Sequence, residues 1–263
     1  MGTRRIRDLV RKTKKVVRLF AHPLWRRGLY HGVAAAVEHA ALPIARDLAT
    51  VIDVGAHKGQ FALFIKGYRP GVELHCFEPL SEPGKTLTRL FHGDRSVHVY
   101  GVALGAKEGS GDMYVSKRND SSSLRELTAL QVSTFPGTDL SHVESVAVKC
   151  LDTTLDVASL KTPLLLKVDV QGSELDVLRG ATDVLKSCRQ VIVECSFVEF
   201  YSGQALFGDV YAYLTACGLK LVAASCNTCS EDGAWLQADV LFETKAWPRR
   251  PGQLPPGKAT QDP

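Results

Sequence analysis

The sequence predicts an α/β protein built on a doubly wound, mostly parallel sheet of seven strands. Short apolar runs alternate with segments of helical periodicity, and the first of these runs contains an acid and opens into a glycine-rich turn. At 263 residues and 45% hydrophobic content, the chain can bury one substantial core without disulfides. The expected strands span residues 51–54, 72–78, 97–104, 164–170, 190–195, 219–224 and 236–243.

The turn after the first expected strand has the form of a ligand-binding loop. Residues 51–61 read Val-Ile-Asp-Val-Gly-Ala-His-Lys-Gly-Gln-Phe. Glycines at the carboxyl end of a strand let the backbone approach a ligand, although they also serve simply to pack a strand against a helix. The third glycine of the dinucleotide fingerprint and the Gly-Lys-Ser/Thr of a phosphate loop are both absent. The turn therefore favours an adenosine ligand without a pyrophosphate and disfavours a nicotinamide oxidoreductase.

A second signal lies nineteen residues after Gly59, where Glu78 closes the next strand-like run. An acid at this position can accept hydrogen bonds from both hydroxyls of a ribose. The two linked signals predict a nucleoside-binding crevice at one edge of the sheet.

The third signal joins the other two into a family pattern. Residues 164–181 read Leu-Leu-Leu-Lys-Val-Asp-Val-Gln-Gly-Ser-Glu-Leu-Asp-Val-Leu-Arg-Gly-Ala, and Val-Ile-Val-Glu follows at 191–194. With Asp-Val-Gly-Ala at 53–56 and Phe-Glu-Pro at 77–79, this order resembles the FkbM family of S-adenosylmethionine-dependent methyltransferases over roughly residues 47–245. The sequence departs from the usual family pattern at His57, where Asn is common, and at Gln171, where Glu is common.

The resemblance implies a Rossmann-like class I methyltransferase that moves a methyl group from S-adenosylmethionine to a hydroxyl oxygen. The acceptor would be a sugar, a glycolipid or a secondary metabolite. The alternative is an inert lipid-surface binding protein that keeps the fold, but the presence of both Asp53 and Glu78 argues against it. The cofactor contacts that the resemblance implies are Asp53, Gly55, Ala56, His57, Gly59, Glu78 and Pro79.

Two charged residues interrupt the most apolar run of the chain. Lys167 and Asp169 lie two residues apart near the end of the fourth expected strand, so they project to the same side. They form either a buried ion pair or the chemical centre, because the end of this strand faces the ligand crevice. We expect Asp169 to orient the acceptor hydroxyl or take its proton, Lys167 to fix that carboxylate, and Glu194 to be a second candidate base.

No resident metal is expected. Asp169, Glu174 and Glu194 could offer oxygen ligands to Mg²⁺. Three carboxylates near one pocket more often bind a polar substrate or cap a helix.

The positive charge of the chain is concentrated at its N-terminus. The first 30 residues hold ten Lys or Arg against one acid, so the remaining residues have 22 basic and 27 acidic side chains and a net charge of −5, against +4 for the whole chain. This segment could be an interfacial helix on anionic lipid, a nucleic-acid arm or a solvated extension, and nucleic acid is not the expected partner. The expected organisation is a basic arm over 1–45, a catalytic domain over 46–245 and a Pro-rich disordered tail over 246–263. No apolar run is long enough to span a membrane. The expected location is the cytoplasm, with the arm as a route to a peripheral membrane position.

Two further features are open to more than one interpretation. Residues 107–154 form a polar insertion whose Asn-Asp-Ser-Ser-Ser-Leu at 119–124 is either a flexible turn or a substrate lid. The seven cysteines are scattered, which favours a reducing compartment. The pair Cys226 and Cys229 lacks the partners of a zinc site and is interpreted as a loop with two thiols.

Overall fold

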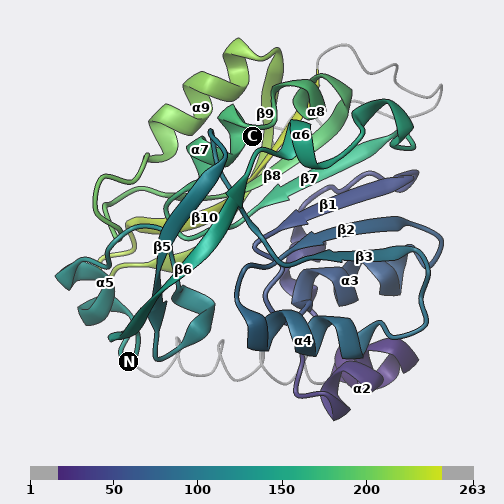
Figure 1. Cartoon of the computed structure of the whole chain (residues 1–263), viewed down its shortest axis with the longest axis horizontal. Coiled ribbons are helices and arrows are strands. Elements are labelled where there is room, and N and C mark those ends of the chain that lie inside the picture. Colours follow the sequence, from purple (N-terminus) through teal and green to yellow (C-terminus); the bar gives the residue numbers. More distant parts are fainter. Residues whose placement is uncertain (1–16, 245–263) are drawn as a thin grey trace, which may run out of the picture.

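The computed structural model describes residues 17–244 and confirms the doubly wound sheet. Seven strands lie in the order β3-β2-β1-β7-β8-β10-β9, and β10 runs antiparallel to the other six (Figure 1). This is the strand order of a class I methyltransferase, with its antiparallel strand inserted near one edge. The strands of this sheet are β1 (Thr50–Val54), β2 (Glu73–Phe77), β3 (Val97–Tyr100), β7 (Leu164–Val168), β8 (Cys188–Ser196), β9 (Leu219–Cys229) and β10 (Trp235–Thr244).

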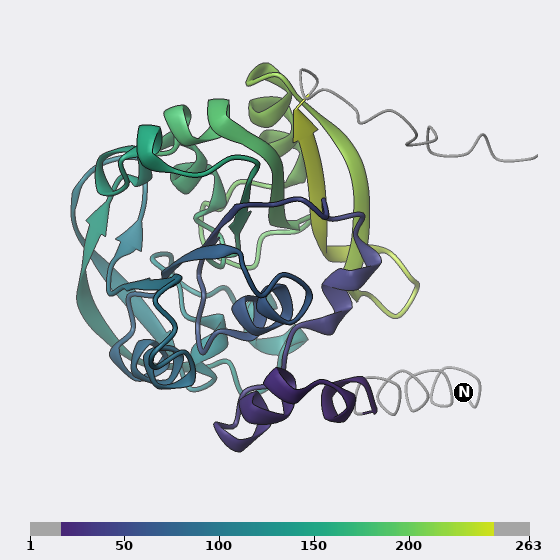
Figure 2. The ribbon, with the colours of Figure 1, turned by 90° about the vertical axis from the view of Figure 1, so that its right-hand side faces the viewer.

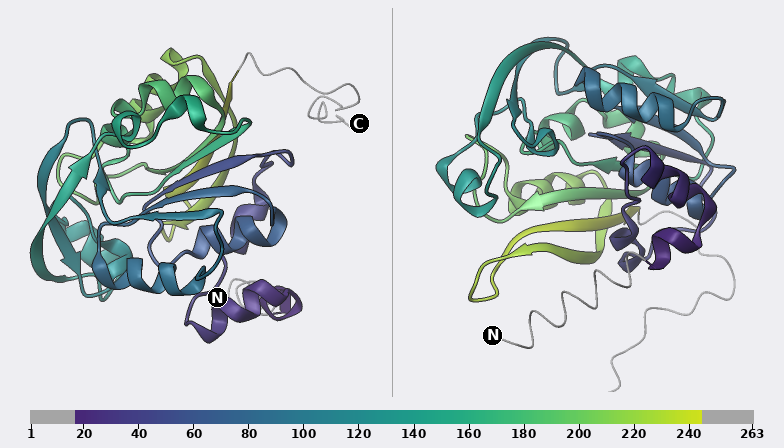
Figure 3. Two further views of the ribbon diagram at one scale, coloured as in Figure 1. Left: turned by 45° about the vertical axis from the view of Figure 1, so that its right-hand side comes forward. Right: turned by 90° about the horizontal axis from the view of Figure 1, so that it is seen from below.

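The central strands are buried on both faces, which explains their continuous apolar sequences. Successive side chains alternate between two cores: Val51 packs with the helices on one face, and Ile52 packs with those on the other. Figure 3 shows one helical layer beneath the sheet and the other above it. The first layer holds α2 (Pro23–Tyr30), the short η1 (Val37–Ala41), α3 (Gln60–Tyr68) and α4 (Ser81–Leu90). The second holds α6 (Leu151–Thr154), α7 (Glu174–Arg179), α8 (Thr182–Ser187) and α9 (Phe207–Ala216), with the short η3 (Val157–Ser159).

The insertion folds into a second, three-stranded sheet of order β4-β6-β5. Its elements are β4 (Ala103–Leu104), β5 (Gly109–Ser116), η2 (Asn119–Ser121), α5 (Ala129–Thr134) and β6 (Leu140–Lys149). The prediction of one strand over residues 97–104 is therefore wrong. The pairing of β3 with β2 ends at Tyr100, and Ala103 and Leu104 pair instead with Val148 and Lys149 of β6.

The segment before β1 belongs to the folded body. Leu19, Trp25, Val33 and Ala35 are buried in the core that also contains α3 and α4, and the Trp25 indole N–H donates to the Leu63 carbonyl (2.9 Å). Figure 2 shows this purple segment packed along the sheet and its helices. The expected boundary of an arm at residue 45 thus falls inside the packed structure. The part of the arm before residue 17 and the Pro-rich tail lie outside the described residues.

Candidate active site

A cavity of about 1200 Å³ opens at the carboxyl ends of β1, β2, β7 and β8. The chain crosses to opposite faces of the sheet on either side of β1, and ligands of open α/β sheets bind where the strand order reverses in this way. A typical pocket for one ligand has roughly 300–1,000 Å³. The cavity therefore has room for a cofactor and an acceptor together.

Eight of the ten predicted site residues line this cavity, and Asp53 and Gly59 do not. The eight are Gly55, Ala56, His57, Glu78, Pro79, Lys167, Asp169 and Glu194.

The glycines of the β1–α3 turn are required by packing. Gly55 has a φ of +78°, and a Cβ there would lie 1.8 Å from the Asp169 carbonyl oxygen. Gly59 has a φ of +93°, and its Cβ would lie 2.6 Å from a methyl of Leu87 in α4. Gly59 thus allows the turn to pack against α4. Gly55 allows the turn to pack against the end of β7, and it lines the cavity.

Glu78 lies just beyond β2 and is held by the backbone. One carboxylate oxygen accepts the His57 N–H (2.9 Å), and the other accepts the Leu80 N–H (2.8 Å). Burial raises the pKa of Glu78 to about 7, although these two hydrogen bonds act to lower it. Each oxygen keeps a lone pair that can accept a hydrogen bond from a ligand hydroxyl.

Lys167 lies between two carboxylates at the end of β7. Its ammonium is 3.1 Å from Asp169 Oδ2 and 3.5 Å from Asp53 Oδ1. Burial opposes the charge of Lys167, but Asp169 and Asp53 outweigh it and raise its pKa. Asp53 is fully buried behind the cavity wall, so it anchors Lys167 rather than facing a ligand. This geometry agrees with the hypothesis that Lys167 and Asp169 form a buried ion pair, and also with the prediction that Lys167 fixes the Asp169 carboxylate.

Gln171 connects the two candidate bases. Its amide nitrogen donates to Asp169 Oδ1 (2.8 Å) and to Glu194 Oε2 (2.7 Å), while its oxygen accepts from the Tyr201 hydroxyl (2.7 Å). Burial acts to raise the pKa of Asp169, but Lys167 and Gln171 outweigh it and hold the pKa below its usual value. Burial and the neighbouring Asp169 raise the pKa of Glu194 well above its usual range. The two neighbouring acids therefore have pKa values displaced in opposite directions, and Asp169 is the more readily ionised.

Glu174 faces away from these acids. Its carboxylate accepts the backbone N–H of Gly172 (2.9 Å) and of Val170 (3.2 Å), and it does not line the cavity. It caps the turn after β7 rather than joining Asp169 and Glu194.

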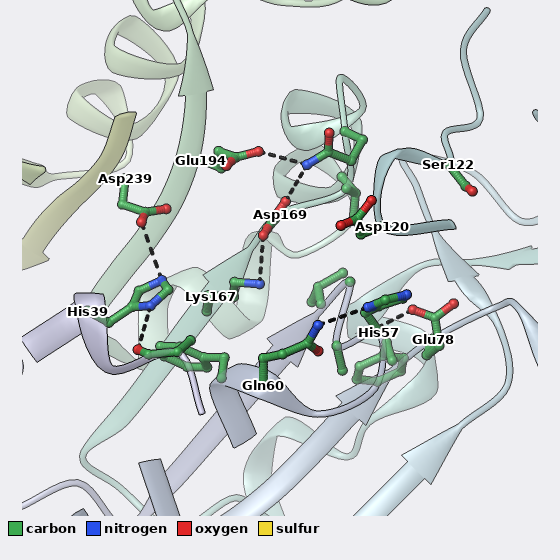
Figure 4. Close-up of a pocket in the computed structure, with 18 of the residues that line it drawn as sticks. His39, His57, Gln60, Glu78, Asp120, Ser122, Lys167, Asp169, Glu194 and Asp239 are labelled. Carbon is green, nitrogen blue, oxygen red and sulfur yellow. Dashed lines mark hydrogen bonds and ion pairs between the residues drawn. The ribbon is translucent and has the colours of Figure 1, made fainter. Parts of the chain in front are cut away.

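The wall opposite the glycine turn comes from residues that the sequence did not predict. His39 of η1 lies 3.4 Å from Asp239 of β10, and the two face each other at one end of the cavity (Figure 4). Asn227 of β9 donates to Glu194 Oε1 (3.1 Å). Asp239 carries a signal that could have been found, because it is a charge within a buried apolar strand, as are Lys167 and Asp53.

The insertion contributes a further wall. Asn119 of η2 hydrogen-bonds His57 Nε2 (2.8 Å), and Asp120, Ser122 and Leu124 also line the cavity. The Ser123 hydroxyl donates to the Gln171 carbonyl (2.5 Å). The serine-rich segment is therefore packed over the cavity by specific contacts, and a lid role stays a prediction.

The sheet topology and this cavity define a methyltransferase of the Rossmann-like class. The methyltransferase FkbM domain matches residues 53–221, and the chain belongs to the FkbM methyltransferase family. S-adenosylmethionine, the cofactor predicted from the sequence, is the methyl donor of this class.

Two curated relatives give the level of similarity. The 2-O-methyltransferase NoeI of Sinorhizobium fredii is 27% identical over 59% of this chain and 66% of its own length. Methyltransferase 1 of Beauveria bassiana is 32% identical over 52% of this chain and 60% of its own. The chain thus spans about 60–66% of the length of these relatives.

Among solved structures, the magnesium protoporphyrin IX methyltransferase of Synechocystis with bound SAM aligns over 88% of this chain and 82% of its own. The identity is 10% and the TM-score 0.39, so this likeness carries no argument about function.

Proposed function

We propose that the chain is an S-adenosylmethionine-dependent O-methyltransferase acting on a hydroxyl of a sugar, a glycolipid or a secondary metabolite. The observation that carries the proposal is the presence, in one cavity, of a backbone-held carboxylate suited to a ribose and an ionised carboxylate suited to an acceptor hydroxyl. Glu78 is the first and Asp169 is the second.

The lining of the cavity fits the cofactor. Glu78 can accept both ribose hydroxyls, since the backbone uses only one lone pair of each oxygen. Beside it, apolar side chains can cover the faces of an adenine ring. They are Phe77, Leu80, Val102, Leu104, Met113 and Leu124.

The chemistry asks little of the protein beyond alignment and proton removal. S-adenosylmethionine supplies a methyl group on a sulfonium, which is already an excellent leaving group. Asp169 has a side chain that is 29% exposed to the cavity and is ionised, so it can accept the hydroxyl proton as the methyl is transferred. Lys167 and Gln171 hold the Asp169 carboxylate, while Glu194, which also lines the cavity, can hydrogen-bond the acceptor.

A hydroxyl-rich acceptor agrees with the polar end of the cavity. Asp169, Glu194, Asp239 and Asn227 all line it and offer hydrogen-bond partners at several positions. The relative NoeI is named as a 2-O-methyltransferase, which supports transfer to oxygen.

Two measurements test the proposal. S-adenosylhomocysteine should raise the melting temperature of the chain, whereas NAD should not. Labelled S-adenosylmethionine incubated with fractionated glycans and lipids should then give a labelled acceptor, with or without a chelator in the reaction. Stabilisation without any methyl transfer would favour the inert lipid-surface protein, and stabilisation by NAD alone would favour an oxidoreductase.

A further inference from the structure

Three metal-ligating side chains gather on β2 and β3, away from the cavity. Glu73 and His75 are two residues apart on β2 and share one face of the strand, and His98 is the register partner of His75 on β3. One ligand atom from each of the three lies within 4.8 Å of the other two. Within residues 17–244 no other group of three His, Cys, Asp or Glu meets this condition.

The distances come close to those of a tetrahedral zinc site. His98 Nε2 lies 3.2 Å and His75 Nε2 lies 4.0 Å from the same oxygen, Glu73 Oε1. Bonds of about 2.0–2.1 Å to a tetrahedral ion place neighbouring ligand atoms roughly 3.3 Å apart. The two imidazole rings are stacked, with centroids 4.9 Å apart, so one ring must turn to direct its lone pair at a shared ion. The His98 side chain is 41% exposed and has the freedom to do so.

His75 has the surroundings of a metal ligand, because one ring nitrogen is held and the other is free to bind. Its side chain is 91% buried, and its Nε2 has no hydrogen-bond partner among the described residues. Its Nδ1 lies 3.0 Å from the Tyr100 hydroxyl. When Nδ1–H donates to that oxygen, Nε2 presents its lone pair toward Glu73, and metal-binding histidines are characteristically held through their other nitrogen in this way.

We propose that Glu73, His75 and His98 form a zinc site, with water in the fourth position. Two imidazoles and one carboxylate are a donor set that Zn²⁺ accepts readily. The ion would join β3, the edge strand of the sheet, to β2, which leads directly to Glu78. Tyr100 stacks on Phe77 of the cavity wall with ring centroids 4.6 Å apart, so the site also supports that wall.

Lys161 places a positive charge beside Glu73, so replacing it tests whether a cation binds there. Its ammonium lies 3.1 Å from Glu73 Oε2, and its side chain is 72% exposed. The ammonium therefore leaves Oε1 to the imidazoles but repels a bound cation. Replacing Lys161 with Met should tighten zinc binding, whereas a simple ion-pair cluster would only lose a partner.

The experiment is a calorimetric titration of the chelator-treated full chain with zinc chloride. One zinc should bind per chain. His98→Ala or Glu73→Gln should weaken binding at least about 100-fold, since a direct ligand matters more than an outer partner, whose loss costs about 10–100-fold. Tyr100→Phe, which keeps the ring stack, should fall in that 10–100-fold range. The control is His92→Ala, which removes an exposed imidazole near β3 and should bind as the wild type does.

Each variant is first compared with the wild type by thermal unfolding without zinc, and Glu73→Gln keeps the test informative if His98→Ala unfolds. Absence of zinc binding by the wild type, or binding by both His98→Ala and Glu73→Gln that is as tight as that of the wild type, would overturn the proposal. Binding that is lost in Glu194→Gln or Cys226→Ser but kept in His98→Ala would place the metal elsewhere and overturn it as well. None of these readouts depends on methyl transfer.

Discussion

At the scale of single residues, Gln171 connects the two acids at the polar end of the cavity. It has a φ of +56° and directs its amide nitrogen between Asp169 and Glu194. A glutamate at this position would bring a third carboxylate to the same point and has no N–H to donate. The amide therefore lets two acids lie close together, with the pKa of Asp169 held below and that of Glu194 raised above the usual range.

This arrangement predicts that Asp169 carries the proton transfer. Asp169→Asn keeps the side-chain volume and should reduce turnover by roughly 10²-fold or more, because an amide cannot accept the hydroxyl proton. Affinity for S-adenosylhomocysteine should stay within a few-fold. Steady-state kinetics and calorimetry on the same preparation check both values. Turnover at the wild-type rate in a folded, cofactor-binding variant would leave Asp169 as a structural partner of Lys167.

Truncation of the Glu78 side chain should reduce the affinity for the cofactor. Glu78→Ala leaves two ribose hydroxyls unpaired and should weaken S-adenosylhomocysteine by about 1.5–3 kcal/mol, the range for hydrogen bonds to a charged group. An unchanged dissociation constant would remove Glu78 from the cofactor site.

The same residue predicts a pH dependence of binding. The pKa of Glu78 is about 7 in the free protein, and ribose hydroxyls donate best to the ionised form. As the pH falls below 7, binding must displace a proton, so the dissociation constant should rise by up to about tenfold per pH unit; above 7 it should level off. Calorimetry between about pH 5.5 and 8.5 measures this. The control is Glu78→Gln, whose profile should lack this slope, and parallel profiles for the two proteins would assign the effect to another group.

At the scale of elements, the central strands were predictable because each carries a local signal. Lys167 and Asp53 stand out as charges within buried runs, and the structure places them together. The end of β3 was not predictable in the same way. Nothing near Gly101 shows that Ala103 and Leu104 pair with a strand more than forty residues later, since that choice is made by tertiary contacts.

The contact between the β1 turn and the end of β7 predicts that Gly55 cannot be replaced without a loss of stability. Gly55→Ala would place a Cβ against the Asp169 backbone in a left-handed conformation, so the two strand ends must separate. We expect a loss of more than about 3 kcal/mol of unfolding free energy, measured by chemical denaturation. The matched control is Gly71→Ala, because Gly71 has ordinary φ and open space around its Cβ position. Equal stability of the two variants would show that the turn can relax.

At the scale of the whole molecule, the cavity joins segments far apart in the chain. His39, Asn119 and Asp239 come from η1, the insertion and the last strand, and no local pattern links them. The motif residues were predictable because they lie at strand ends whose position the fold class dictates. The other walls depend on how the insertion and the N-terminal segment pack, which sequence spacing does not encode.

Some side chains of the N-terminal segment are buried, and others, both cationic and apolar, are exposed. Leu19 and Trp25 are in the core, whereas Val17, Phe20 and Tyr30 are exposed by 63%, 58% and 90%. Seven Lys or Arg lie before residue 17 and outside the described residues, and Arg18, Arg26 and Arg27 follow. No helix among residues 17–244 is long and apolar enough to cross a membrane. Cations beside exposed apolar groups are instead the composition of a segment that lies on an anionic lipid surface.

We therefore predict that the full chain binds acidic vesicles and that a shortened chain beginning at Val17 binds them less. Starting near Leu42 would be a poor comparison, because it removes Trp25 and Val33 from the core. Each engaged cation contributes about 1 kcal/mol at low salt, so even two or three of the seven should change partition by at least about tenfold. Co-sedimentation with phosphatidylserine-containing vesicles measures the difference, with neutral phosphatidylcholine vesicles and high salt as controls. Equal partition of the two chains onto acidic vesicles would show that the basic residues before Val17 are a solvated extension.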